Sequence, residues 1–344
     1  MAEKIKLSLK AYFESKIKGA KNVEIREYSQ PSAGWSDEAF IFDVHWETAS
    51  GVQKKGFAVR KQNKGGLMRE NRNFFLQFKY LDRLSKNCDL PIPGVYWYET
   101  DESILGGPFF VMDKLPGNSY VPWSKEGQLF FKRANEEGEI PFHFVQYLAK
   151  LHLLDYRGAG FTEDFDEPKG EYGFIDDKLI GLEEMYYRYQ ISPDPVMVDA
   201  LEWLKAHKPA AQRYSLIHND YRTGNLLYSH NEITGILDWE AAEIGDPMAD
   251  VAYVCAKSNR MDSPLMCYLV DRQLFLDTYS ELTGLRVDEK VLHYYEVYHQ
   301  VRFVLISQSA GKSFAKGETK DLRMARQGYR WPLMRNMVAE LLGY

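Results

Sequence analysis

The sequence predicts an α+β protein, with a small antiparallel sheet in its first part and a larger, mostly helical second part. Apolar and polar residues alternate over residues 40–46, and residues 55–61 form a matching hairpin partner across a turn at 49–51. Residues 107–112 read as a further strand. Apolar residues recur at helical spacing over residues 141–152, which predicts a core helix.

The remaining elements follow from the same patterns. The first segment, to about residue 20, predicts an amphipathic helix with apolar side chains at Ile5, Leu7, Leu9, Tyr12 and Phe13. Residues 161–178 show little periodicity and predict a loop. Helices are expected from about residue 182 to 208 and from 292 to the end, and most of their many aromatic side chains are expected to be packing residues.

Composition describes an ordinary globular protein of 344 residues, with 45% hydrophobic and 27% charged residues. A net charge of −6 argues against a general nucleic-acid binder. The three cysteines include no CxxC pair, so neither a disulfide framework nor a zinc site is indicated. No apolar run reaches the roughly 18 residues of a membrane span. We therefore expect a soluble, cytoplasmic monomer or homodimer without nucleic-acid or membrane partners.

The chemistry is concentrated between His218 and Asp238. The spacing His-x-Asp-x-x-x-x-Asn, from His218 through Asp220 to Asn225, equals that of a kinase catalytic loop. Asp220 can accept a proton from a hydroxyl group, and Asn225 and Asp238 offer the hard oxygen ligands that Mg²⁺ prefers. Arg222 stands where a cation can reach a transferring phosphate. The pattern predicts an ATP-dependent phosphotransferase.

The alternative is that these polar residues only cap turns, the common fate of Asp and Asn. The flanking runs at 214–217, 226–228 and 233–237 read as short strands of a hairpin, and this context favours the chemical interpretation.

The chain resembles the aminoglycoside phosphotransferase/choline kinase superfamily, especially the branch that includes the kinase domains joined to acyl-CoA dehydrogenases. The resemblance is carried by residues 218–227, 235–240 and 245–250, with further matches at 108–113, 148–152 and 294–297. It implies a two-lobed, protein-kinase-like fold with ATP and Mg²⁺ as cofactors. Residues 1–116 are expected to form the nucleotide-binding lobe, and residues 117–344 the helical lobe with the catalytic loop and the acceptor site.

The resemblance also implies a nucleotide-binding set in the first lobe. Ser36 matches a position that contributes to the phosphate loop, and Arg60 fills the slot that holds a lysine in protein kinases. Arg60 and Lys61 face opposite sides of a strand, so only one of them can contact phosphate. The side chain that orients Arg60 has two candidates, Glu70, which would form an ion pair, and Gln77, which would form a weaker hydrogen bond.

Three residues at the end of the strand at 107–112 and just after it complete this set. In the resembling family this segment is the hinge between the lobes, and its backbone groups meet adenine; Met112, Asp113 and Leu115 occupy it here.

Several polar residues are assigned structural roles instead. His218 is expected to hold the backbone of the catalytic loop, and His152 to be a packed core histidine. Asp246 and Asp250 are expected to cap helices and to tie down the loop, because Asp is a preferred N-cap residue.

The expected acceptor is a hydroxyl group of a small molecule, and two classes remain open. An anionic, partly apolar acceptor such as a hydroxyacyl thioester would suit the basic residues Arg302, Lys312, Lys316 and Arg323. An aminoglycoside or amino alcohol would suit the acidic residues Glu163, Asp164, Asp166 and Glu167.

Two functions other than transfer to a small molecule are possible for such a sequence. A nucleotide-binding pseudokinase or regulatory scaffold is the alternative function, and the complete set of Asp220, Asn225 and Asp238 argues against it. Trp239 and Glu240 stand where protein kinases carry Phe-Gly, which argues against a protein kinase.

Overall fold

The structure is a computed structural model that describes residues 2–31, 37–63 and 73–344. Within these ranges the predicted α+β class is confirmed. The chain divides into two compact units, one of residues 1–86 and 92–116 and the other of residues 87–91 and 117–344. No helix in the described ranges combines the length and the apolar character needed to cross a membrane.

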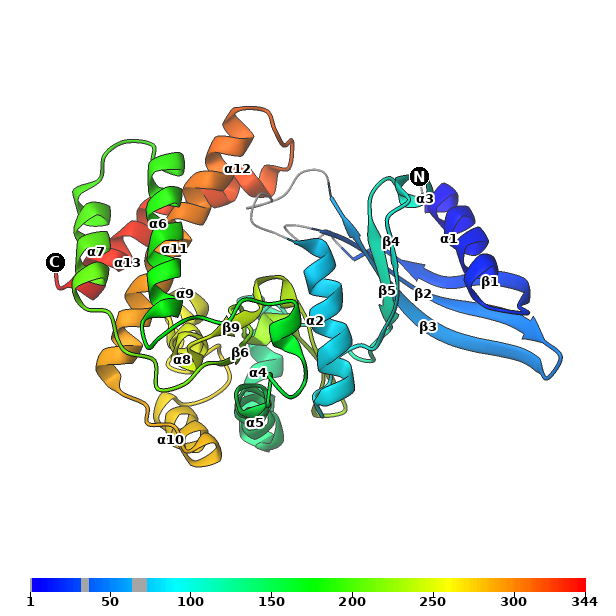
Figure 1. The fold of residues 1–344 in the computed structure, drawn as a ribbon, viewed down its shortest axis with the longest axis horizontal. Helices are drawn as coiled ribbons and strands as arrows, with labels where there is room; N and C mark the ends of the chain where they lie inside the picture. Colours follow the sequence, from blue (N-terminus) through cyan, green and yellow to red (C-terminus); the bar gives the residue numbers. More distant parts are fainter. Residues whose placement is uncertain (1, 32–36, 64–72) are drawn as a thin grey trace. The chain divides into compact units, whose positions relative to one another are not determined.

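The first unit is built on an antiparallel sheet with the strand order β1-β2-β3-β5-β4 (Figure 1). Its strands are β1 (Lys21–Ser29), β2 (Asp37–Thr48), β3 (Gly51–Gln62), β4 (Val95–Glu99) and β5 (Phe109–Asp113). The predicted hairpin is confirmed, because β2 and β3 pair along their whole length up to Thr48 opposite Gly51. Gly51 has a φ of 108°, a conformation that glycine adopts without strain.

Helices α1 (Ala2–Lys16) and α2 (Phe74–Asn87) cover opposite faces of this sheet (Figure 1), and the short α3 (Glu102–Leu105) precedes β5. Successive side chains of a strand point to opposite faces. The ring of Phe109 accordingly lies 5.0 Å from Tyr12 of α1, whereas the ring of Phe110 lies 5.1 Å from Phe74 of α2. Leu7, named among the apolar side chains of the predicted amphipathic helix, does not share the buried face of α1. It is 67% exposed because it lies on the opposite side of the helix from buried Leu9.

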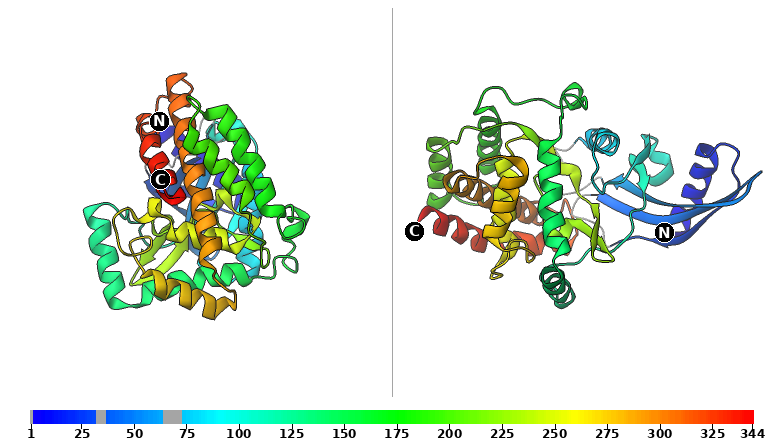
Figure 2. Two further views of the ribbon diagram at one scale, coloured as in Figure 1. Left: turned by 90° about the vertical axis from the view of Figure 1, so that its left-hand side faces the viewer. Right: turned by 90° about the horizontal axis from the view of Figure 1, so that it is seen from below.

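The second unit is mainly helical, and its longest helix, α11 (Glu289–Ala315), contacts α6, α7, α8, α12 and α13 (Figure 2). The other helices are α4 (Lys125–Glu137), α5 (Glu139–Leu153), α6 (Gly173–Tyr189), α7 (Pro195–Ala206), α8 (Pro247–Cys255), α9 (Lys257–Arg260), α10 (Arg272–Thr283), α12 (Leu322–Gly328) and α13 (Trp331–Leu342). Helix α5 confirms the core helix predicted at 141–152.

The loop predicted at residues 161–178 is partly wrong. The structure places a 3₁₀ turn at Phe161–Glu163 and begins α6 at Gly173, because Phe174, Ile175 and Leu179 supply a buried stripe that extends into the acidic, glycine-rich stretch. The helices expected from about residue 182 to 208 are α6, which extends to Tyr189, and α7. Asp194 caps α7 and Pro195 occupies its first turn, a combination that starts a new helix.

Two small antiparallel ribbons complete the second unit. Strand β7 (Leu226–Ser229) pairs with β8 (Glu232–Ile236), which confirms the predicted hairpin. Strand β6 (Ser215–Ile217), expected to belong to that hairpin, instead pairs with β9 (Glu243–Gly245), with Leu216 opposite Ile244. Strand β9 is only three residues long, too short for a period of two to be visible in the sequence.

Candidate active site

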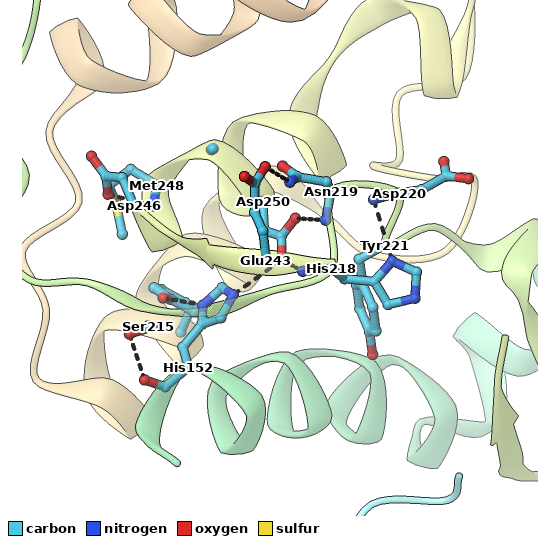
Figure 3. A network of polar contacts seen from close by, with 12 residues as sticks. His152, Ser215, His218, Asn219, Asp220, Tyr221, Glu243, Asp246, Met248 and Asp250 are labelled. Carbon is cyan, nitrogen blue, oxygen red and sulfur yellow. Dashed lines mark hydrogen bonds and ion pairs between the residues drawn. The ribbon is translucent and has the colours of Figure 1, made fainter. Parts of the chain in front are cut away.

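The loop that follows β6 is held in place by one buried carboxylate, Asp250 of α8. Its Oδ2 accepts the backbone N–H of His218 at 2.7 Å, and its Oδ1 accepts the backbone N–H of Asn219 at the same distance (Figure 3). His152 of α5 adds a third hydrogen bond, from Nε2 to Oδ2 at 3.2 Å. Burial opposes ionisation of Asp250, but these donors outweigh it and hold its pKa below the usual value. Asp250 therefore fixes the loop, as predicted, but it lies inside α8 and does not cap it, because the N-cap of that helix is Asp246.

Two further predicted structural roles are visible around this carboxylate. His152 is fully buried, and its Nδ1 lies 2.7 Å from the hydroxyl of Tyr279, so the prediction of a core histidine is confirmed. Asp246 caps α8 by accepting the backbone N–H of Met248 at 2.9 Å. Its other oxygen accepts the Tyr295 hydroxyl at 2.9 Å.

Asn219 gives the loop its sharp turn. Its φ is 60°, in the left-handed region, where Asn is among the better tolerated residues. The side-chain amide donates to the carbonyl of Ala241 at 2.9 Å and to Glu243 at 2.6 Å. His218 and Asp220 precede and follow this turn, and their side chains therefore have different surroundings.

His218 uses both ring nitrogens within the site. Nε2 lies 2.9 Å from the carbonyl oxygen of Leu237, which can only accept, so Nε2 carries the proton. Nδ1 then accepts the backbone N–H of Asp220 at 3.3 Å. His218 thus links the loop to the residue that precedes Asp238, in a geometry suited to positioning rather than to proton transfer.

Asp220 is oriented by three side chains. Oδ1 accepts Nε of Arg222 at 3.1 Å and also the hydroxyl of Tyr253, while Oδ2 accepts Nδ2 of Asn225 at 2.7 Å. Burial raises the pKa of Asp220, but the charge of Arg222 and the hydrogen bonds of Tyr253 and Asn225 outweigh this effect, so its pKa lies below the usual value. The carboxylate is ionised at neutral pH and can accept a proton from a hydroxyl group.

Asn225 and Asp238 fit the donor set expected for Mg²⁺. The amide nitrogen of Asn225 donates to the backbone oxygen of Asp220 at 2.9 Å as well as to its carboxylate, and no described residue donates to the amide oxygen. The backbone of Leu237 donates to the carbonyl of Asn225 at 2.8 Å, which ties the two segments together. Asp238 has a φ of 62°. Its negative charge, together with that of Asp220, raises the pKa of the Arg222 guanidinium, although burial acts in the opposite direction.

In the first unit, Arg60 pairs with an acid that the sequence did not indicate. Its Nε lies 3.0 Å from Oδ2 of Asp37, and the two side chains are only 14% and 10% exposed. Asp37 lies two residues before Ala39, which is opposite Arg60 across β2 and β3, so both side chains face the same side. Lys61 faces the other side and pairs with Glu38 at 2.9 Å, which confirms the predicted alternation.

Three of the predicted nucleotide-binding positions are placed as follows. Met112 and Asp113 end β5, and Leu115 follows two residues later. The carboxylate of Asp113 accepts Nζ of Lys55 at 3.1 Å and the backbone N–H of Gly94 at 3.1 Å, so this side chain braces the sheet.

Ser36 and Glu70 lie outside the described residues. Gln77, the alternative partner of Arg60, lies on the buried stripe of α2.

The sequence interpretation missed two functional candidates, Asp37 and Tyr253. Asp37 contacts Arg60 because of the register of the β2–β3 hairpin. The alternating pattern that predicted this hairpin covered residues 40–46 and did not reach Asp37. Tyr253 lies 33 residues beyond Asp220 in the sequence. Its position one helical turn after Asp250 was the signal in the sequence that could have identified it.

The chain is similar to several known proteins. A family model described as the phosphotransferase enzyme family matches residues 27–285. Acyl-CoA dehydrogenase family member 10 of Mus musculus is 31% identical over 199 residues, which are 57% of this chain and 18% of the relative. The chain thus spans less than a fifth of that relative's length.

Two solved structures share the fold. One is a protein of Ralstonia eutropha JMP134 with a provisional assignment as an aminoglycoside phosphotransferase; it is 21% identical, with 97% of each chain covered and a TM-score of 0.70. The other is a thermostable mutant of aminoglycoside phosphotransferase APH(4)-Ia, solved with AMP-PNP and hygromycin B. It is 17% identical, with 96% of this chain and 98% of that chain covered and a TM-score of 0.59. These likenesses confirm the predicted two-lobed, kinase-like α+β fold.

Proposed function

Because the chain belongs to the phosphotransferase enzyme family, we propose that it transfers the γ-phosphate of Mg-bound ATP to a hydroxyl group of a small molecule. The observation that carries the proposal is Asp220, an ionised carboxylate oriented by three donors on a loop that Asp250 clamps. Phosphoryl transfer depends on positioning and on charge stabilisation more than on covalent chemistry, and such a loop provides both.

Different residues of the second unit have different roles in the proposed reaction. Asp220 accepts the proton of the acceptor hydroxyl, and Arg222 stabilises charge on the transferring phosphate. Asn225 and Asp238 would hold Mg²⁺, which when bound would neutralise phosphate charge. His218 holds the loop in the geometry that these roles require.

The first unit is proposed to bind the nucleotide. The APH(4)-Ia structures with AMP-PNP or ADP support nucleotide binding in this fold. Arg60 contacts the phosphates and Asp37 orients its guanidinium, while the backbone at Met112, Asp113 and Leu115 meets adenine. Ser36 and Glu70 remain predictions for the phosphate loop and for the acid of the following segment.

For the acceptor, the second unit favours an anionic molecule. Three of the four basic residues near the C-terminus have local partners: Lys312 donates to the carbonyl of Arg188, Lys316 lies 3.9 Å from Glu318, and Arg323 pairs with Asp321. Among the acidic residues at 163–167, Glu167 also has a local partner, because it pairs with Arg157.

Arg302 differs from those three basic residues. Among the residues that the structure describes, none accepts a hydrogen bond or an ion pair from its half-buried guanidinium. It adjoins Phe303, whose ring lies 5.8 Å from that of Tyr253, the hydroxyl donor to Asp220. A negative group on the acceptor would pair with Arg302. The CoA thioester of a hydroxyacyl group carries negative phosphate groups on its CoA part, and it also agrees with the acyl-CoA dehydrogenase relatives.

The test is ADP release with Mg-ATP over a panel of aminoglycosides, macrolides, amino alcohols, sugars and hydroxyacyl thioesters, with Asp220→Ala as the blank. We expect turnover with a hydroxyacyl thioester in the wild type and none in the blank. Arg302→Gln should lower kcat/KM for that acceptor by roughly tenfold to a hundredfold, the range for a lost hydrogen bond to a charged group. Turnover with aminoglycosides alone would contradict the anionic acceptor. Mg-ATP binding without turnover on any acceptor would favour a pseudokinase.

A further inference from the structure

We propose that Tyr253 is a positioning residue that occupies Oδ1 of Asp220 and thereby directs the acceptor hydroxyl to Oδ2. This inference rests on the proposed phosphotransfer. It assigns a task in catalysis to a buried tyrosine outside the motif that carries the chemistry.

The hydrogen bonds on Asp220 are distributed unevenly between its two oxygens. Oδ1 accepts both the Tyr253 hydroxyl and Nε of Arg222, whereas the one side-chain donor to Oδ2 among the described residues is Asn225, at 2.7 Å. A carboxylate oxygen has two lone pairs, so Oδ1 is filled and Oδ2 retains one site. In the transfer step the acceptor O–H bond breaks and its proton passes to Oδ2. The acceptor oxygen bonds to the γ-phosphorus as the bond from phosphorus to the leaving oxygen of ADP breaks.

The position of Tyr253 in the fold suits this task. It lies three residues after Asp250 on α8, so one helix holds both the backbone of the loop and the carboxylate of Asp220. The side chain is 4% exposed, and its ring lies 5.0 Å from His299 and 5.8 Å from Phe303 of α11. Two elements therefore fix the direction in which the hydroxyl points.

The charged surroundings keep Tyr253 as a donor. Burial and the charge of Asp220 raise the pKa of its hydroxyl well above the usual value, against the opposing charges of Arg222 and Arg302. Burial lowers the pKa of His299, the titratable group against its ring, to about 4, so His299 is neutral at pH 7.

The chain offers a matched control in Tyr295 of α11. Its hydroxyl also donates to a buried carboxylate, that of Asp246 at 2.9 Å, and its side chain is 1% exposed. Asp246 caps a helix and has no place in the transfer. Tyr253→Phe and Tyr295→Phe each delete one oxygen while the ring stays in place, so the two variants differ mainly in which carboxylate loses a donor.

The experiment measures kcat, the KM for the acceptor and the Kd for Mg-ATP in both variants, with urea unfolding alongside. We expect Tyr253→Phe to lower kcat by roughly tenfold to a hundredfold with Mg-ATP binding unchanged, and Tyr295→Phe to keep the wild-type kcat. Full kcat in Tyr253→Phe, or an equal loss in both variants, would overturn the inference.

A second readout does not require turnover and separates this inference from the proposed function. The free energies of unfolding of Tyr253→Phe, Asp220→Asn and the double variant form a cycle, and we expect them to be non-additive because the two side chains share a hydrogen bond. Additive effects would overturn the inference. Absence of turnover in the wild type would instead count against the proposed function.

Discussion

At the scale of single residues, the loop at 218–220 shows how a strained backbone is kept in place. The left-handed φ of 60° at Asn219 is a conformation that costs about 1–3 kcal/mol for a residue other than glycine. Asp250 offsets this cost by accepting two consecutive backbone N–H groups, and the Asn219 amide donates to Ala241 and Glu243. The loop therefore has one well-defined geometry before any ligand binds.

Asp246 provides a prediction about pH. Burial raises the pKa of this carboxyl from 3.8 to about 6, although Met248 and Tyr295 donate hydrogen bonds to it. A folded-state pKa above the unfolded value means that the folded protein holds the proton more tightly. The resulting contribution to stability is fully present below pH 3.8 and is lost as the pH rises through about 6.

Asp246→Asn should remove this dependence while keeping the helix cap, because Asn is also a preferred N-cap residue. We expect the free energy of unfolding of the variant, relative to the wild type, to rise by up to about 3 kcal/mol between pH 4 and pH 7. Urea unfolding at four pH values in this interval measures the difference. The contributions of the other titrating groups are the same in both proteins and cancel in that difference. If the free energies of unfolding of the two proteins changed in parallel with pH, the pKa of Asp246 would not be raised in the folded state.

At the scale of elements, helices α11 and α12 approach each other through two glycines. A Cβ atom on Gly328 would lie 2.5 Å from Cα and 3.0 Å from the backbone nitrogen of Gly311. Such a contact with backbone cannot be relieved by a side-chain rotation. The closeness of the two helices therefore depends on the absence of a side chain at this crossing.

Gly328→Ala should destabilise the protein by about 1–3 kcal/mol, the range for overpacking. Gly181, in the interior of α6, is the matched control because nothing lies within 4 Å of a Cβ built there. Gly181→Ala should stabilise by about 0.5–1 kcal/mol, through the helix propensity of alanine. Urea unfolding of both variants checks the opposite signs. A neutral Gly328→Ala would mean that α12 moves freely relative to α11.

The elements also show which structural features are readable from the sequence. The hairpin of β2 and β3 and the core helix α5 were predicted because each repeats its pattern over many residues. Strand β9 has three residues and no visible period, and the start of α6 lies in a stretch whose acidic and glycine residues resemble a loop. Local pattern is informative only where an element is long enough to display its period.

The candidate site was readable to a similar extent. The spacing of Asp220, Asn225 and Asp238 identified the loop because those residues lie close together in the sequence. The contacts of Asp37 with Arg60 and of Tyr253 with Asp220 depend on strand register and helix packing, which bring together residues 23 and 33 positions apart. These partners became visible only in the structure.

At the scale of the whole molecule, the residues proposed for the reaction belong to both units. Arg60 and Asp37 lie in the first unit, and Asp220, Asn225 and Asp238 lie in the second. The family model covers residues 27–285 and so includes these five residues, whereas Arg302, proposed for the acceptor, lies beyond it. The central claim is a division of labour in which Asp220 serves the chemical step and Asp238 serves metal and nucleotide binding.

The most direct test compares Asp220→Ala with Asp238→Ala, measuring phosphoryl transfer and the Kd for Mg-ATP in the same preparations. We predict that Asp220→Ala binds Mg-ATP as tightly as the wild type and transfers no phosphate, because only the proton acceptor is lost. Asp238→Ala should weaken Mg-ATP binding itself, because a carboxylate ligand of the metal is lost. Transfer by Asp220→Ala at the wild-type rate would contradict the account.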